Sequence, residues 1–128
     1  MKKNFKRVLI VDDDPQIVEH LKSFLKRKGF IADFAYDGEE AIKLLDKSKP
    51  DLVILDVLMP RKDGFEVLRY LKSKSVYSKI PVIMLTAKSK KKDVEKGIFL
   101  GADFYLPKPF TLENLNEFID LVIGKKEF

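Results

Sequence analysis

The amino-acid sequence predicts an α/β fold, in which helices cover both faces of a doubly wound, five-stranded parallel sheet. Short apolar runs rich in Val, Ile and Leu alternate with longer amphipathic segments along the 128 residues. Runs that are apolar on both faces are typical of buried parallel strands. Right-handed crossovers then place the intervening helices on both sides of the sheet. We expect one domain over residues 1–128, with its core at about residues 6–123.

Five apolar runs are the predicted strands. Pro50 precedes the third run and Pro81 opens the fourth, at strand starts where proline is tolerated. The second run alternates only in part, whereas the others are nearly continuous. The predicted strands are Val8–Val11, Phe30–Ala35, Leu52–Leu55, Val82–Leu85 and Phe104–Leu106.

Capping residues mark the predicted helices between these strands. Asp14 with Pro15, Asp37 and Thr111 are placed to cap the first, second and last helices. Gly101 is a stop signal for the fourth helix, and Lys28-Gly29 is one for the first. The apolar faces or ranges of the helices are Ile17 to Leu25, Ala41 to Leu45, about Phe65 to Ser73, about Lys90 to Leu100, and Leu112 to Val122.

Charge and composition exclude several classes of protein. There is no cysteine, which excludes disulfide frameworks and thiolate chemistry. The formal net charge is +5, and its densest run is Lys88, Lys90, Lys91 and Lys92. No aromatic residues interleave with that run, so we interpret it as a solvated surface and expect no direct nucleic-acid contact. No apolar run approaches the roughly 18 residues of a membrane span, and no signal peptide is visible, so we expect a cytoplasmic protein.

Polar residues stand where the predicted strands end. They are Asp12, Asp13 and Asp14 after the first strand, Asp56 after the third, Thr86 after the fourth and Lys108 after the fifth. Ligands bind at the carboxyl ends of strands in open α/β sheets. If the first and third strands are neighbours, the carboxylates converge, and like charges so close cannot all stay ionised and unpaired. A hard cation with oxygen ligands, such as Mg²⁺, would relieve the repulsion.

The same residue types suit phosphoryl transfer. A carboxylate can be the nucleophile and form an acyl phosphate, while a lysine and a hydroxyl bind the phosphoryl oxygens. Each residue alone has an ordinary structural interpretation: Asp14 is better read as a helix cap, and Tyr105 as a core residue. The hypothesis therefore depends on the whole set.

This set resembles the receiver domain of bacterial two-component response regulators, over essentially the whole chain. The matching motifs are Val11-Asp12-Asp13-Asp14, Leu55-Asp56-Val57-Leu58-Met59-Pro60 with Asp63-Gly64, Leu85-Thr86-Ala87 and Lys108-Pro109-Phe110. The resemblance implies a flavodoxin-like fold with strand order 2-1-3-4-5. It also implies that Asp56 accepts a phosphoryl group from a sensor histidine kinase or a histidine phosphotransfer protein.

The resemblance further implies a role for each site residue. Asp13 and Asp56 would bind Mg²⁺ directly, Asp12 largely through water, and Leu58 through its backbone carbonyl. Lys108 would bind the phosphoryl group.

The switch residues implied by the resemblance are Thr86 and Tyr105. Hydrogen bonding of Thr86 to the phosphoryl oxygens would vacate space into which Tyr105 turns from exposed to buried. A cis peptide between Lys108 and Pro109 is also implied.

The fourth strand, the helix after it and the fifth strand form the expected output surface, which includes residues 88–92. Its partner would be a downstream effector protein or domain. A monomer and a phosphorylation-dependent dimer both remain open, as do a stand-alone receiver and the N-terminal part of a longer regulator. Leu58 and Lys88 look unsuited to orienting an attacking water, so we expect slow self-dephosphorylation without other enzymatic activity.

Three alternatives are weaker. An FMN-binding electron carrier of similar topology would need a first loop rich in Gly, Ser or Thr to hold phosphate, where this chain has three aspartates. An aspartate-nucleophile phosphatase would need a second acid two residues after the nucleophile, where Leu58 stands. An inactive interaction module would be expected to lack Asp56 or Lys108, and both are present.

Overall fold

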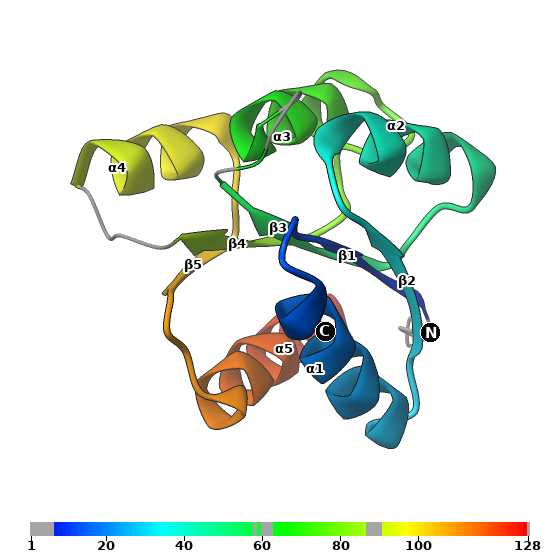
Figure 1. Ribbon diagram of the computed structural model, residues 1–128. Helices are drawn as coiled ribbons and strands as arrows, with labels where there is room; N and C mark the ends of the chain where they lie inside the picture. The colour runs from blue at the N-terminus through cyan, green and yellow to red at the C-terminus, as the bar shows by residue number, and fades with distance from the viewer. Residues whose placement is uncertain (1–6, 58, 60–62, 87–90, 128) are drawn as a thin grey trace.

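One parallel sheet forms the centre of the computed structural model, which confirms the predicted α/β fold (Figure 1). The structure describes residues 7–57, 59, 63–86 and 91–127. The strands are β1 (Arg7–Val11), β2 (Ile31–Ala35), β3 (Leu52–Asp56), β4 (Val82–Thr86) and β5 (Phe104–Pro107). Their order in the sheet is β2-β1-β3-β4-β5, with every neighbouring pair parallel, which confirms the order that the resemblance implied.

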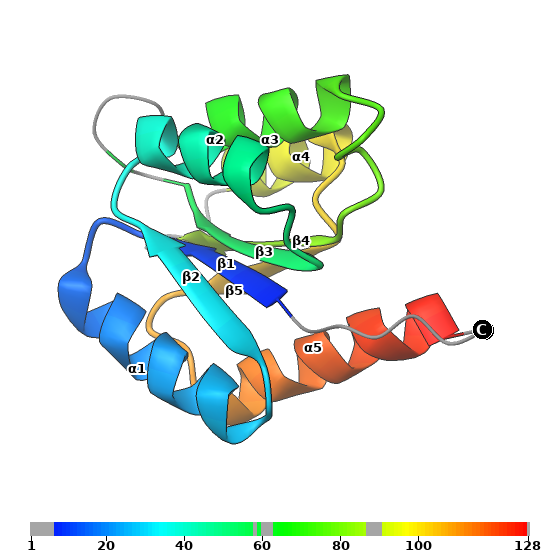
Figure 2. The ribbon, with the colours of Figure 1, turned by 90° about the vertical axis from the view of Figure 1, so that its right-hand side faces the viewer.

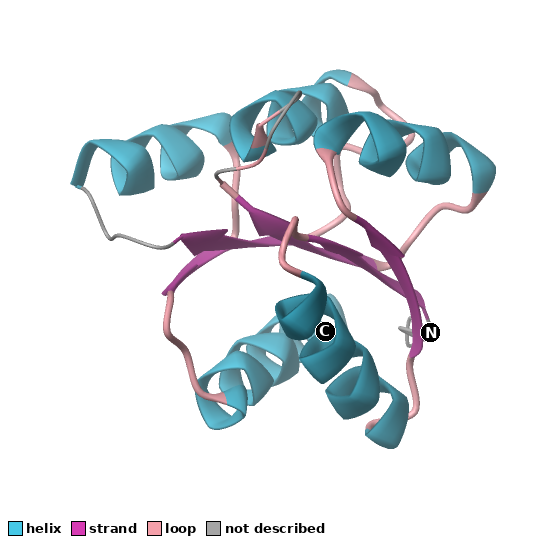
Figure 3. Cartoon of the chain, in the orientation of Figure 1, coloured by secondary structure: helices cyan, strands magenta, loops and turns pink. Residues whose placement is uncertain are grey.

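Helices cover both faces of this sheet. They are α1 (Pro15–Arg27), α2 (Gly38–Lys47), α3 (Gly64–Ser73), α4 (Lys91–Leu100) and α5 (Leu112–Glu127). Helices α2, α3 and α4 lie on one face, and α1 and α5 lie on the other (Figure 3). The view from the side shows the same two helical layers with the sheet between them (Figure 2). Within the described ranges, no helix has the length and apolar character needed to cross a bilayer.

Two apolar clusters fill the spaces between the sheet and its helical layers. Strand residues alternate between them: Val53 and Leu55 face α2 and α3, whereas Leu52 and Ile54 face α1 and α5. All five residues of β3 and of β4 are buried. This two-sided burial explains why the central strands are continuous apolar runs in the sequence.

The edge strand β2 is more exposed than the central strands. Its first residue, Ile31, is 52% exposed, in keeping with the partial alternation of this run. Phe30 was predicted to be in the strand but precedes it, because its backbone N–H donates to the carbonyl of Leu25 at the end of α1. Gly29, with φ of +93°, makes the left-handed turn that this helix end requires.

The predicted helix caps are present. Asp14 accepts a hydrogen bond from the backbone N–H of Gln16, and Asp37 accepts one from Glu40. Thr111 accepts one from the backbone N–H of Asn114 at the start of α5. A cap that the sequence analysis missed is Asp63, which forms a capping box with Glu66 and begins α3.

Hydrogen bonds of two tyrosines join α2 to α3 and to the segment after α3. The hydroxyl of Tyr77, a buried residue, donates to Asp46 Oδ1 at 2.7 Å and contacts the carbonyl oxygen of Leu45 at 3.1 Å. Tyr70 of α3 donates to the same carboxylate at 3.0 Å. The hydrogen bond to Asp46, together with burial, raises the pKa of Tyr77 to about 12. These contacts hold the two helices together on the face that also carries α4.

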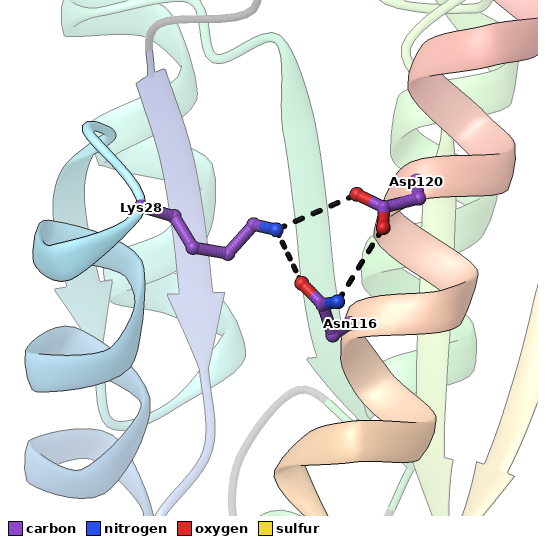
Figure 4. A network of polar contacts seen from close by, with 3 residues as sticks. All are labelled: Lys28, Asn116 and Asp120. Carbon is purple, nitrogen blue, oxygen red and sulfur yellow. Dashed lines mark hydrogen bonds and ion pairs between the residues drawn. The ribbon is translucent and has the colours of Figure 1, made fainter.

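A surface network joins α1 to α5 on the opposite face (Figure 4). The ammonium of Lys28 donates to Asn116 Oδ1 and lies 3.4 Å from Asp120 Oδ1. Asn116 in turn donates to Asp120 Oδ2 at 3.4 Å. Because Asp120 is exposed, we assign this network a small share of the stability.

The Tyr77 attachment can be tested with a pair of matched substitutions. We expect Tyr77→Phe to lower the free energy of unfolding by about 1 kcal/mol, because it removes the hydrogen bond that this buried hydroxyl donates to Asp46. Tyr70→Phe removes a hydroxyl from the same carboxylate at a more exposed position and should stay within about 0.5 kcal/mol of wild type. Urea unfolding followed by circular dichroism measures both. Equal losses for the two variants would contradict the assigned importance of Tyr77.

Candidate functional site

Strand register brings the predicted site residues to one edge of the sheet. Val11 of β1 pairs with Leu55 of β3, so Asp12, just after β1, lies beside Asp56, the last residue of β3. Thr86 at the end of β4 pairs with Pro107 of β5, and the chain then continues into Lys108. The carboxyl ends of four strands therefore meet as the sequence predicted.

Three aspartates form the acidic part of the site. Carboxylate oxygens of Asp12, Asp13 and Asp56 all lie within 4.8 Å of one another. Asp12 and Asp56 are buried, with 0% and 3% exposure, whereas Asp13 is exposed. Asp14 contributes instead as the cap of α1, so the cap interpretation of this residue is confirmed.

Lys108 supplies a positive charge to the cluster. Its ammonium lies 2.8 Å from Asp12 Oδ2 and 3.4 Å from Asp56 Oδ1. Its backbone N–H donates to the carbonyl oxygen of Thr86, which ties the turn after β5 to the end of β4. The peptide bond between Lys108 and Pro109 is cis, as the resemblance implied.

Burial and charge act on Asp56 in opposite directions. Burial, reinforced by the nearby Asp12 carboxylate, raises the pKa of Asp56 to about 6, although Lys108 pulls it down. Burial also disfavours the charged form of Lys108, but contacts with Asp12 and Asp56 outweigh this effect and raise the lysine pKa. The cluster therefore holds more negative charge than its lysine balances.

The chemistry of the donor set fits a metal ion. Asp12 Oδ1 accepts a hydrogen bond from the backbone N–H of Asp14 at 3.0 Å. Its other oxygen, Oδ2, is buried and lies 2.8 Å from the Lys108 ammonium. Converging carboxylate oxygens with an excess negative charge are ligands that a hard divalent cation prefers. The acidic triad could thus bind a metal.

The remaining predicted residues differ in how they are placed. Thr86 is 2% exposed at the end of β4, the strand adjacent to β3 and Asp56. Tyr105 is half-buried and packs against the core cluster on the α4 side. Leu58, the predicted carbonyl ligand, lies outside the described residues, as does Lys88.

Gly64 has a role at the site that the sequence analysis did not assign. A Cβ atom on Gly64 would lie 2.1 Å from the backbone oxygen of Asp56, so any larger residue would displace one of the two chain segments. The Gly64 N–H also donates to the carbonyl of Val57 at 2.8 Å. The start of α3 is thereby packed directly on the backbone that carries Asp56. The Asp63-Gly64 pair was the available sequence signal for a special role of Gly64. The pair does not show that Gly64 packs against the backbone of Asp56.

Comparison with known proteins assigns this fold and site to a family. The family model described as "Response regulator receiver domain" matches residues 8–120. The chain therefore belongs to the response regulator receiver family, whose members are phosphorylation switches rather than enzymes that turn over a separate substrate. Membership implies a histidine kinase as partner. It also favours the receiver interpretation over the flavin carrier and the phosphatase.

Similar proteins include longer regulators and stand-alone receivers. The chain is 40% identical over 122 residues to the alkaline phosphatase synthesis transcriptional regulatory protein PhoP of Bacillus subtilis, covering 95% of this chain and 50% of PhoP. The chain spans about half the length of the curated relatives it matches. A structure of the Vibrio cholerae chemotaxis protein CheY4 superposes with a TM-score of 0.87 at 33% identity, covering 93% of this chain and 99% of CheY4. A CheY-like receiver domain protein from Methanospirillum hungatei superposes with a TM-score of 0.90 at 27% identity, covering 97% of this chain and 98% of that protein.

The charge imbalance predicts that Asp56 destabilises the metal-free protein at neutral pH. The pKa of Asp56 is about 6 in the folded chain, against an ordinary value of 3.8. Because the folded chain holds this proton more tightly than the unfolded chain, protonated Asp56 contributes to the free energy of unfolding. This contribution is complete below about pH 4 and is lost as the pH rises through about 6. We expect Asp56→Asn to raise the free energy of unfolding by about 1–2 kcal/mol above pH 7 in EDTA, a value that discounts the shift for solvent screening.

Thermal unfolding over a pH series measures this effect. The advantage of Asp56→Asn should shrink towards acidic pH, and added Mg²⁺ should stabilise wild type more than the variant. Asp13→Asn is the matched control, because it removes the same charge from an exposed position and should change stability less. A variant no more stable than wild type above pH 7 would contradict the assigned charge imbalance.

Proposed function

We propose that Asp56 of this receiver domain accepts a phosphoryl group, with Mg²⁺ held by Asp12, Asp13 and Asp56. The observation that carries this proposal is the buried Asp56 carboxylate, clustered with two further acids and contacted by the Lys108 ammonium. The donor would be a sensor histidine kinase or a histidine phosphotransfer protein in the cytoplasm. The chain would serve as a single receiver domain over residues 1–128, on its own or joined to an effector.

The residues of the chain divide the chemistry between them. A carboxylate oxygen of Asp56 attacks phosphorus, and the bond from phosphorus to the donor nitrogen breaks as the acyl phosphate forms. A pKa of about 6 leaves Asp56 mostly ionised at neutral pH and therefore nucleophilic. Bound Mg²⁺ supplies positive charge to the phosphoryl oxygens during transfer.

Lys108 is placed to follow the transferred group. Its ammonium contacts both Asp12 and Asp56, so a small movement brings it to a phosphoryl oxygen while it keeps the Asp12 contact. Thr86, buried at the adjacent strand end, would donate its hydroxyl to another phosphoryl oxygen. Both groups stabilise charge that develops on those oxygens.

The donor protein would dock beside the site. A groove of about 730 Å³ lies between α1 and the start of α5, and Lys108 is among its lining residues. Apolar side chains make up much of its wall, including Ile17 and Phe110, and His20 stands at the same groove. An apolar surface that adjoins the phosphoacceptor supports contact with a protein donor.

The output would pass through α4 and its neighbouring strands. Ile98 and Phe99 of α4 are 63% and 87% exposed, and large apolar side chains exposed at consecutive positions favour a protein interface. Movement of Thr86 towards the phosphoryl group would change how Tyr105 and α4 pack, which is a shift between existing conformations. An effector protein or domain, or a second copy of the chain after phosphorylation, would then bind.

Phosphoryl uptake from acetyl phosphate tests the acceptor. We expect the intact mass of wild type to increase by one phosphoryl group when Mg²⁺ is present, and Asp56→Asn to show no increase. Asp14→Asn is the control, because this exposed aspartate caps α1 outside the cluster. Uptake that persists in Asp56→Asn would move the acceptor to another residue, and uptake in EDTA at the full rate would contradict a role for the metal.

The lifetime of the phosphoryl group depends on residues outside the described part of the chain. Leu58 is apolar and cannot orient a water molecule towards the acyl phosphate. We therefore expect slow self-dephosphorylation, and Leu58→Asn should increase the rate of phosphate loss several-fold. Phosphate release after removal of acetyl phosphate measures the rate, with Lys88→Ala compared in parallel. An unchanged rate in Leu58→Asn would contradict this explanation.

A further inference from the structure

A glycine inside α4 lies directly against the ring of Tyr105. A Cβ atom built on Gly97 would be 2.2 Å from Cε2 of Tyr105, 3.1 Å from Cζ and 3.2 Å from Cδ2. The edge of the ring thus occupies the space that a side chain at position 97 would take. Tyr105 belongs to β5, next to α4 in the fold (Figure 1).

The backbone gives no other reason for a glycine at this position. Among the described glycines only Gly29 and Gly101 have positive φ, so Gly97 has a conformation open to any residue. Glycine in the interior of a helix weakens that helix relative to alanine. The absence of a side chain at Gly97 therefore allows the Tyr105 ring to approach α4 closely.

The helix around Gly97 is attached to its surroundings on both sides. The carbonyl oxygen of Gly97 accepts a hydrogen bond from the N–H of Ala102 at 2.9 Å, in the turn that leads to β5. The ammonium of the preceding residue, Lys96, lies 4.5 Å from the ring centroid of Phe65 in α3. Because the atoms that a Cβ at position 97 would meet all belong to a side chain, an added side chain would move the Tyr105 ring rather than the helix backbone.

We propose that Gly97 is a positioning residue that sets the orientation of Tyr105 by leaving space for its ring against α4. The contact itself is independent of phosphorylation; its role in switching rests on the proposed function. Any side chain at position 97 excludes the packed orientation, so the ring turns away from α4. Since vacated space near Thr86 favours the packed ring, such a variant disfavours the phosphorylated conformation.

A double-mutant cycle tests the contact without any phosphoryl group. We expect Gly97→Ala to lower the melting temperature of wild type, because the new methyl group displaces the ring. In the Tyr105→Ala background the same change should raise the melting temperature, because alanine favours a helix over glycine. A decrease of equal size in both backgrounds would overturn the proposal.

Fluorine NMR of protein labelled with 3-fluorotyrosine reports the ring directly. The chain has four tyrosines, and Tyr105→Phe identifies the resonance of Tyr105. Gly97→Ala should shift that resonance and leave the other three in place. Gly29→Ala is the matched control: it is strained by positive φ but meets nothing within 4 Å, so it should lower stability without moving the Tyr105 resonance. An unmoved Tyr105 resonance in Gly97→Ala would also overturn the proposal.

The link to the switch is tested with beryllofluoride and Mg²⁺ as a mimic of the bound phosphoryl group. We expect Gly97→Ala to bind it several-fold more weakly than wild type, while Gly29→Ala binds like wild type at a temperature where it is folded. Unchanged binding in Gly97→Ala, with a displaced ring, would overturn the link. Failure of wild type itself to bind would contradict the proposed function, whereas the cycle and the NMR shift decide the Gly97–Tyr105 contact alone.

Discussion

The excess of negative charge at one edge of the sheet is the constraint on which the site depends. Three carboxylates gather together, two of them are buried, and one ammonium lies beside those two. Such a cluster disfavours folding until a cation or a proton enters it, so the rest of the chain must supply the stability. The wholly buried strands β3 and β4 supply it, because each contributes apolar side chains to both clusters. The buried strands therefore offset the free-energy cost of the acidic cluster at their ends.

Backbone contacts, more than side chains, hold the charged groups in place. Parallel register sets Asp12 beside Asp56, and the Gly64 approach packs α3 on the Asp56 carbonyl. On the other side, the Lys108 N–H donates to the Thr86 carbonyl, so the lysine and the threonine move with the same strand ends. A group that binds at Asp56 therefore acts on backbone segments that are already joined to β4 and β5. This explains how a local charge change could reach the α4 surface.

Local patterns predicted the fold well, and distant contacts poorly. The central strands and the caps Asp14 and Asp37 were predictable, because burial on two faces and capping both leave a signal within a few residues. The start of β2 was one residue off, since the Phe30 N–H completes the end of α1 instead. The Tyr77–Asp46 attachment joins residues 31 apart in the sequence, and the Gly97–Tyr105 contact joins a helix to the strand that follows it; no periodicity encodes such pairs. Resemblance to a family, not periodicity, identified the roles within the acidic site.

The way each helix is attached separates α4 from the others. Helices α1 and α5 bury rows of Leu, Ile and Val against the sheet, which makes their displacement costly. Described contacts of α4 include the Lys96–Phe65 pair and the glycine against Tyr105, while Ile98 and Phe99 face outward. Contacts of this kind are weaker than a continuous apolar seam, so a modest change at the strand ends can alter them. A helix whose described residues make few buried apolar contacts and expose an apolar pair suits a surface that changes partners while the core stays fixed.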